Sequence, residues 1–178
     1  MEFRRITVAE YDRMVQHGIL TEEDRVELIR GRLFGIPEVS DRHAACVKRS
    51  NALFHSLARG RWIVSVQDPV RCEDSKPEPD LALLRSRADF YAESTPQAAD
   101  ILLLIEVADS SLDFDRGVKA ALYAEAGVAE YWVVNLIDSC VEVHRGPRSN
   151  GTYADSESVV KGGTVSFQGG DVSADQLF

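Results

Sequence analysis

Apolar residues occur along the chain in two patterns, short unbroken runs of strand length and longer segments in which they recur every three or four positions. The runs at 101–107, 131–135 and 140–144 are typical of β-strands. The first of these is apolar on both faces until Glu106, which indicates a central strand covered on both sides. These runs predict a β-sheet as the core of the fold.

Three segments have helical spacing, and their ends carry the usual signals. The first begins after Thr7, which can form a capping box with Glu10. The second covers about 42–57 and can be capped by Ser40-Asp41, and the third covers 113–126 and stops before a glycine. We therefore expect helices among the strands.

The remaining strands are shorter. Residues 26–36 predict a β-hairpin around Arg30-Gly31, and further strands are expected at 62–66, 69–72 and 81–84. The order of elements predicts an α/β fold in which a mixed sheet is flanked by helices, with an N-terminal helix and hairpin. We expect one domain over 1–178, with a core at about 5–145 and a β-rich extension at about 146–178.

The charge of the chain is strongly acidic but uneven. The 178 residues include 20 Lys and Arg against 29 Asp and Glu, a net charge of −9, which argues against a protein that coats nucleic acid non-specifically. Residues 1–61 hold 11 basic and 9 acidic side chains, whereas 62–178 hold 9 basic and 20 acidic ones. A local site for nucleic acid in the first third is therefore compatible with the total charge.

Several classes of protein are poor fits. The longest apolar runs are far shorter than the ~20 residues of a membrane helix, and the first residues lack the apolar stretch of a signal peptide. Cys46, Cys72 and Cys140 are widely spaced and odd in number, so neither a zinc ribbon nor a disulfide framework is expected. We expect reduced cysteines, no membrane and a cytoplasmic location.

Two carboxylates interrupt the apolar strands. Asp80 follows Pro79 at the head of an apolar run, and Glu106 lies near the end of the most hydrophobic strand. A carboxylate in such a place is costly unless it is paired, solvated or bound to a cation. If the two strands are neighbours, both acids join one cluster whose oxygens suit Mg²⁺. The alternative is that each acid reaches water at a strand edge.

The motifs around these acids resemble a known family. Pro79-Asp80, Glu106-Val107-Ala108 and the run at 115–132 resemble the Uma2 family, a branch of the PD-(D/E)XK nuclease superfamily. Residues 27–33, His43 and residues 66–70 are similar as well, so the resemblance covers about 5–145. It implies a restriction-endonuclease-like fold, with a mixed central sheet flanked by helices.

The resemblance also implies a chemistry. It assigns Asp80 and Glu106 to one or two Mg²⁺ ions, with Mn²⁺ as an alternative, and a lysine to the attacking water. Ala108 stands where the superfamily has that lysine, and in the Uma2 branch the displaced lysine corresponds to Lys119. A solvated lysine on a helix face is the other interpretation of Lys119. Tyr123, one turn later, is expected to pack in the core.

Further residues are candidates for supporting roles, each with a plainer alternative. Gln67 could bind substrate or a metal-bound water, or be a half-exposed polar group on a strand. Glu27 could add a third carboxylate or pair with an arginine. His43 could touch phosphate or a catalytic water, or lie on the surface. Lys48 and Arg49 could contact phosphates or form a solvated helix face.

Together these features predict a metal-dependent endonuclease that acts on nucleic acid, with DNA as the expected polymer and a homodimer as the expected assembly. The main alternative is a nuclease-like domain that binds nucleic acid or protein without cleaving, which Ala108 favours. A third hypothesis uses Asp80 and Glu106 as an acid/base pair on a sugar or small phosphate. The low aromatic content, 8%, does not favour a sugar cleft.

Overall fold

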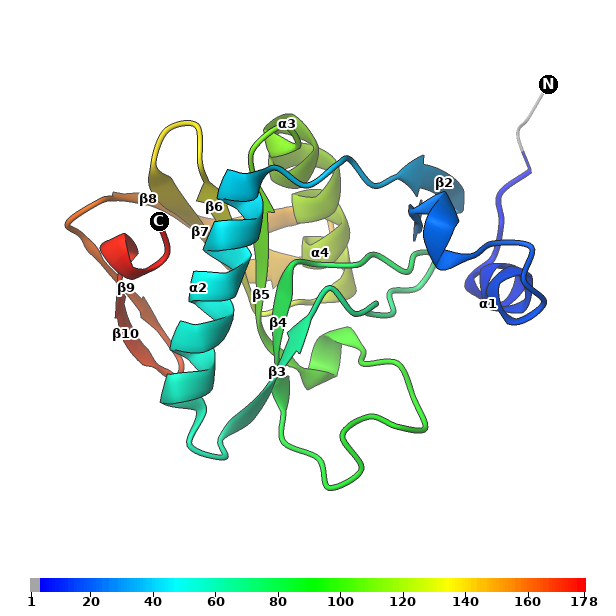
Figure 1. Ribbon diagram of the computed structural model, residues 1–178, viewed down its shortest axis with the longest axis horizontal. Coiled ribbons are helices and arrows are strands. Elements are labelled where there is room, and N and C mark those ends of the chain that lie inside the picture. The colour runs from blue at the N-terminus through cyan, green and yellow to red at the C-terminus, as the bar shows by residue number, and fades with distance from the viewer. Residues whose placement is uncertain (1–3) are drawn as a thin grey trace.

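A six-stranded mixed sheet forms the centre of the structure, a computed structural model that describes residues 4–178 (Figure 1). The strands are β3, β4, β5, β6, β7 and β8 in spatial as well as chain order, at Trp62–Val66, Leu81–Arg85, Ile101–Ala108, Glu130–Asn135, Cys140–Arg148 and Thr152–Val160. Only β5 and β6 pair in parallel, and all other neighbours in this sheet are antiparallel. The strand at β5 is interior and almost fully buried, as predicted.

Alternation along β4 and β5 divides the core into two layers. Leu81, Leu103 and Ile105 share a cluster with residues of α2 (Asp41–Ala58), which crosses one face of the sheet. Leu104 lies in a second cluster with residues of α4 (Ala120–Ala126), on the opposite face (Figure 1). Because Glu106 is two residues after Leu104, its side chain belongs to the α4 face.

The predicted third helix contains an irregular turn. It consists of α3 (Leu112–Phe114), a π-helical turn η3 (Asp115–Lys119) and α4. Gly127 ends α4 with a φ of +85°, a conformation that glycine adopts without strain. Isolated π-turns inside helices are rare and often mark functional sites.

The N-terminal helix and hairpin lie beside one end of the sheet, at the right of Figure 1. Helix α1 (Val8–Gln16) has the predicted capping box. Strands β1 (Val26–Ile29) and β2 (Arg32–Gly35) are joined by Arg30-Gly31, both with positive φ, as a tight hairpin turn requires. The hairpin is attached to α1 by a cluster of Val8, Tyr11 and Leu28.

The predicted strand at 69–72 is wrong. The segment makes only an isolated bridge between Arg71 and Gln97. The N–H groups of Val70 and Cys72 instead donate to the carbonyls of Pro77 and Ser75. Because these groups close turns within one loop, they cannot pair with a neighbouring strand.

The segment after residue 146 contributes to the same sheet and core. Strand β8 pairs with β7, and β9 (Thr164–Phe167) and β10 (Gly170–Ser173) form a separate antiparallel pair. Buried residues of this region, among them Val165, Val172 and Leu177, join the layer under α2. The described residues also form short helical turns, η1 (Glu22–Asp24), η2 (Ala98–Asp100) and η4 (Ala174–Gln176).

Two further predictions concern the cysteines and the presence of membrane-spanning helices. Cys46, Cys72 and Cys140 are all free and buried in the structure. Within residues 4–178, no helix combines the length and the apolar character that crossing a membrane requires.

Candidate active site

Asp80 and Glu106 meet where β4 and β5 lie side by side. The antiparallel register sets Leu81 opposite Ile105. Because Asp80 precedes Leu81 and Glu106 follows Ile105, the two acids face each other across the two strands. The Asp80 N–H donates to Glu106 Oε2 at 3.4 Å, and the Val107 N–H donates to Asp80 Oδ2 at 2.8 Å. Both side chains are buried. The structure therefore brings together the two acids that the sequence singled out.

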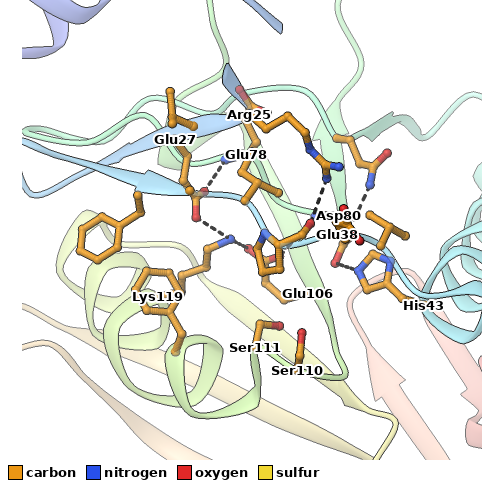
Figure 2. A pocket seen from close by; sticks show the side chains of 18 of the residues that line it. Arg25, Glu27, Glu38, His43, Glu78, Asp80, Glu106, Ser110, Ser111 and Lys119 are labelled. Atoms are coloured by element: carbon orange, nitrogen blue, oxygen red, sulfur yellow. Dashed lines mark hydrogen bonds and ion pairs between the residues drawn. The ribbon is translucent and has the colours of Figure 1, made fainter. Parts of the chain in front are cut away.

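Lys119 reaches this pair from the π-helical turn. Its Nζ lies 3.0 Å from Glu106 Oε1 and 3.3 Å from Glu27 Oε1 (Figure 2). The lysine is 6% exposed, so it is not the solvated helix-face residue of the alternative interpretation. Ala108, on the same strand, is fully buried among apolar neighbours of the α4 layer. The cation near Glu106 thus comes from the helix rather than from the strand.

Tyr123 has a polar contact that its predicted core role did not include. It is fully buried in the α4 layer, as expected, but its Oη also donates to Glu106 Oε1 at 2.8 Å. Glu106 Oε1 therefore accepts from both Tyr123 and Lys119. The spacing of four residues between these two donors is the sequence signal that could have identified the contact.

Glu27, on strand β1 of the N-terminal hairpin, is also part of the site. It is 4% exposed, and its Oε2 accepts the Glu78 N–H at 3.0 Å while Oε1 faces Lys119. Among residues 4–178, the ion pair of Glu27 is with Lys119 rather than with the arginine of the plainer alternative. A third carboxylate therefore stands beside the lysine.

His43 and Gln67 both contact Asp80. His43 Nε2 lies 3.0 Å from Asp80 Oδ2, and its buried Nδ1 has no partner among residues 4–178. The Gln67 amide donates to Asp80 Oδ1 at 3.4 Å. Gln67 was expected on a strand, but β3 ends at Val66 and Gln67 has a φ of +55°. Such a left-handed conformation is uncommon for a residue other than glycine and tends to occur at functional sites.

The electrostatics of the cluster are dominated by burial and by an excess of carboxylates. Burial raises the pKa of Glu106 well above its usual value, and Lys119 offsets this only in part. Burial likewise raises the pKa of Asp115 to about 6. Burial alone would lower the pKa of Lys119, but the charges of Glu106, Glu27 and Asp115 outweigh it and shift that pKa upward.

His43 shows the same competition. Burial alone would lower the pKa of this imidazole, but the hydrogen bond and charge of Asp80 raise it more, so the net shift is upward. The neighbouring carboxylates thus favour the protonated, positively charged forms of Lys119 and His43.

The cluster lies on the wall of a cavity of about 770 Å³. The cavity is strongly acidic, since its lining within residues 4–178 includes eight carboxyl groups, whereas its basic side chains are Arg25, Lys119 and His43. The eight are Glu22, Glu27, Glu38, Glu78, Asp80, Glu106, Asp109 and Asp115. Asp115 and Glu78 were missed as site residues because nothing in their local sequence distinguishes them from exposed acids.

The donor set can be compared with the needs of a divalent metal. Within residues 4–178, no group of three or more His, Cys, Asp and Glu side chains is arranged to hold a metal ion. Mg²⁺, however, is usually bound by one or two carboxylates and completes its shell with water and substrate phosphate. Asp80 and Glu106 supply two adjacent carboxylates in a cavity with excess negative charge, and these residues fit such an ion.

Lys48 and Arg49 are not part of this site. Both are exposed on α2, and neither lines the cavity. Arg49 lines a separate, smaller depression together with Arg42 and Lys161. Phosphate contacts by Lys48 and Arg49 stay a prediction, and they would be made outside the acidic cavity.

Comparison with known proteins gives the following. A family model described as Uma2, putative restriction endonuclease, matches residues 8–171. Among solved structures, the chain is similar to a putative nuclease belonging to DUF820 from Anabaena variabilis, with a TM-score of 0.77, 17% identity and 97% of each chain covered. No curated protein matches the chain. At this identity the structural likeness shows the fold, and it confirms the predicted fold class.

Proposed function

The chain belongs to the Uma2 family, and we propose that it is a metal-dependent endonuclease that hydrolyses phosphodiester bonds of nucleic acid, with DNA as its substrate. One observation carries the proposal. Lys119 Nζ lies 3.0 Å from Glu106 Oε1 on the wall of an open cavity, and Glu106 lies next to Asp80. Two acids and a lysine beside a cavity are the groups that metal-assisted hydrolysis of a phosphodiester uses.

The residues that would hold the ion are Asp80 and Glu106. A divalent cation, Mg²⁺ or Mn²⁺, bound there would polarise a phosphoryl oxygen and lower the pKa of a bound water. The charge balance supports this assignment, since in the described part of the chain eight carboxyl groups of the cavity face two permanent cations, Arg25 and Lys119.

Lys119 would act as a hydrogen-bond donor and a positive charge rather than as a base. Its pKa is raised by the charges of Glu106, Glu27 and Asp115, which outweigh burial, so it keeps its proton. An ammonium has three N–H groups, of which two can be directed at Glu106 and Glu27. The third is available to the attacking water or to the charge that develops on the phosphoryl oxygen.

The surrounding residues would position these groups. Tyr123 and Lys119 both donate to Glu106 Oε1, whereas Oε2 is directed at Asp80 and accepts its N–H. His43 and Gln67 both contact the Asp80 carboxylate, and Figure 2 shows His43 on the side of Asp80 that faces away from Lys119. We assign His43 and Gln67 to positioning Asp80 and to contact with the substrate or with water in the cavity.

A second candidate function is binding without cleavage. The observation that favours it is the lack, within residues 4–178, of a group of three or more metal-ligating side chains. A module of this kind would bind nucleic acid or protein and take up divalent ions poorly.

The test is cleavage together with metal binding. We expect the purified chain with Mg²⁺ or Mn²⁺ to cut DNA, and Asp80→Asn to reduce the rate at least about a thousandfold, since metal assistance contributes several kcal/mol. Calorimetric titration with Mn²⁺ should show binding to the wild type that Asp80→Asn weakens.

The matched control is Asp171→Asn, which removes an exposed carboxylate on β10 outside the cavity and should change neither readout. Cleavage that survives Asp80→Asn would overturn the residue assignment. If no DNA or RNA is cut under any metal while the chain still binds nucleic acid, the second candidate replaces the first. The homodimer and the cytoplasmic location stay predictions, and sedimentation of the purified chain measures the first of these.

A further inference from the structure

The acidic cavity has an apolar wall that the catalytic proposal does not use. The hairpin and the segment that follows it supply this wall, with Val26, Phe34, Ile36, Pro37 and Val39, and Phe114 adds a second aromatic ring. The rings of Phe34 and Phe114 lie 5.2 Å apart between centroids and are tilted by 42°. Both side chains pack against the small cluster of Ile29, Cys72 and Leu122 on one side, yet both also line the cavity. Part of their aromatic surface is therefore open to an occupant.

The charge of the cavity limits what can occupy it. Double-stranded DNA carries one negative charge per ~1.7 Å of its axis. A length of that backbone laid along the cavity would set several phosphates against eight carboxyl groups. Arg25, one of the two permanent cations, already donates to the Pro37 carbonyl. One phosphate beside Asp80 and Glu106 can be balanced by an ion and Lys119, but the rest of the space suits an uncharged group.

A nucleobase is the uncharged part of a nucleic acid that fits an aromatic wall. Every base has a flat π-face that stacks on aromatic side chains, whatever its identity. Carboxylate oxygens such as those that line the cavity accept hydrogen bonds from exocyclic amino groups. Enzymes that need a base out of the duplex act on single strands or extrude the nucleotide into a pocket.

We propose that the cavity takes one unpaired nucleobase against Phe34, next to the phosphate held at Asp80 and Glu106, so that single-stranded or locally unpaired nucleic acid is the substrate class. This inference rests on the proposed function for the position of the phosphate. The basic side chains of α2, Lys48 and Arg49, are exposed outside the cavity and would be available to flanking phosphates.

The wall is held in place before any ligand binds. The Ile36 N–H donates to the Arg25 carbonyl at 2.7 Å, and Ser40 Oγ donates to Asp109 Oδ2 at 2.7 Å. The segment from β2 to α2 is thus anchored at both ends. A wall that is ordered in advance costs less entropy when a ligand binds.

The first experiment compares substrates of one sequence. The wild type with Mg²⁺ or Mn²⁺ is given a single-stranded oligonucleotide, the same strand in a perfect duplex, and a duplex with an unpaired nucleotide, in DNA and in RNA form. We expect kcat/KM for the single strand and for the unpaired site to exceed that of the perfect duplex at least tenfold. Equal cleavage of the perfect duplex would overturn the inference while leaving the proposed function intact.

The second experiment measures binding without cleavage. The Asp80→Asn protein is titrated with a fluorescent single strand and with a chain of equal length in which every nucleotide is abasic, so that both carry the same phosphates. We expect the strand with bases to bind tenfold or more tightly, on the order expected for one stacked base. Phe34→Leu keeps an apolar side chain without a π-face and should make the affinities for the two strands nearly equal. Phe34→Tyr should retain the tenfold difference.

A matched control and the remaining outcomes separate the two proposals. Phe90→Leu changes an aromatic residue that is 73% exposed and outside the cavity, and it should leave the ratio unchanged. Base-dependent binding without any cleavage would overturn the proposed function and support the base pocket. Equal binding of the abasic chain, or a ratio that Phe34→Leu does not reduce, would overturn the base pocket.

Discussion

Two networks of charged side chains start from the same short turn of backbone, the π-helical turn Asp115–Lys119, and reach different parts of the molecule. Lys119 joins Glu106 and Glu27, and the three side chains are between 4% and 8% exposed. Arg116 joins Glu142 on β7 through several contacts, the longest at 3.0 Å, and its side chain is 40% exposed. One network is buried and the other borders solvent.

The two networks also differ in charge balance. Burial alone would raise the pKa of Glu142, but hydrogen bonds from Arg116 and Asn135 lower it more, and the net shift is downward. In the buried network the order is reversed, since burial prevails and the pKa values of Glu106 and Asp115 are raised. The ionised form is therefore favoured by folding at Glu142 and disfavoured at Glu106 and Asp115.

This difference separates a network that stabilises the fold from one that reduces stability. Balanced pairs near the surface contribute modestly to folding. An unbalanced, buried cluster lowers stability, and such clusters with perturbed pKa values concentrate at functional sites. The comparison supports the assignment of chemistry to the Lys119 network and of a positioning role to the Arg116 network, which fixes the turn to β7.

Removal of the buried cation, Lys119, is the change with the largest expected effect. Lys119→Gln leaves Glu106 and Glu27 buried without their counter-charge, and we expect the free energy of unfolding to fall by about 3–5 kcal/mol. Urea unfolding at pH 8 in the presence of EDTA measures this loss. Cleavage by the folded variant should also fall by orders of magnitude, because the donor beside the reacting phosphate is gone.

The comparison for this prediction is Arg116→Gln. Because the guanidinium is 40% exposed, the loss should be no more than about 1 kcal/mol. Equal losses in the free energy of unfolding for the two variants would show that the charges of the buried Lys119 network are as well balanced as those of the Arg116 network.

Neutralising a buried acid should raise stability, with a characteristic pH dependence. The pKa of Asp115 rises from 3.8 to about 6 on folding, so its contribution is fully present at low pH and is lost as pH rises from about 4 through 6. That shift corresponds to about 3 kcal/mol. Asp115→Asn mimics the protonated form and can still accept from Ser111 Oγ. We expect it to exceed the wild type by about 2–3 kcal/mol at pH 7.5 and to match it at pH 4.

Denaturant titrations of metal-free protein at several pH values measure the difference. A variant that is less stable than the wild type at pH 7.5 would mean that Asp115 is stabilised by its surroundings rather than penalised by burial.

The acids of the site could be found from the sequence, but the full cluster could not. Asp80 and Glu106 stood out because a carboxylate in an apolar strand needs a partner. Glu27 and Lys119 had two interpretations each, since their contact joins the hairpin to the helix and depends on how distant segments pack. Lys119 was assigned through family resemblance, because the π-turn that directs it has no simple sequence pattern.

The fold shows the same division between local and distant causes. Caps, the hairpin turn and the central strand follow from neighbouring residues, and all three were predicted correctly. The strand predicted at 69–72 failed because its N–H groups close turns within its own loop. The apolar wall of the cavity likewise arises from residues that look like ordinary core positions, and only their placement beside the acids distinguishes them.

The smallest expected effect tests the balanced network with the opposite pH dependence. Because the pKa of Glu142 is lowered on folding, its ion pair contributes stability above the unfolded value of 4.5 that is lost as pH falls through the lower folded value. Glu142→Gln should therefore cost about 1 kcal/mol at pH 7.5, and the deficit should shrink below pH 4.5. The same denaturant titrations apply. Asp115→Asn should gain on the wild type as pH rises, and Glu142→Gln should lose, so variants in the two networks would have pH slopes of opposite sign. Slopes of the same sign would mean that burial, and not the supply of cations, controls both networks.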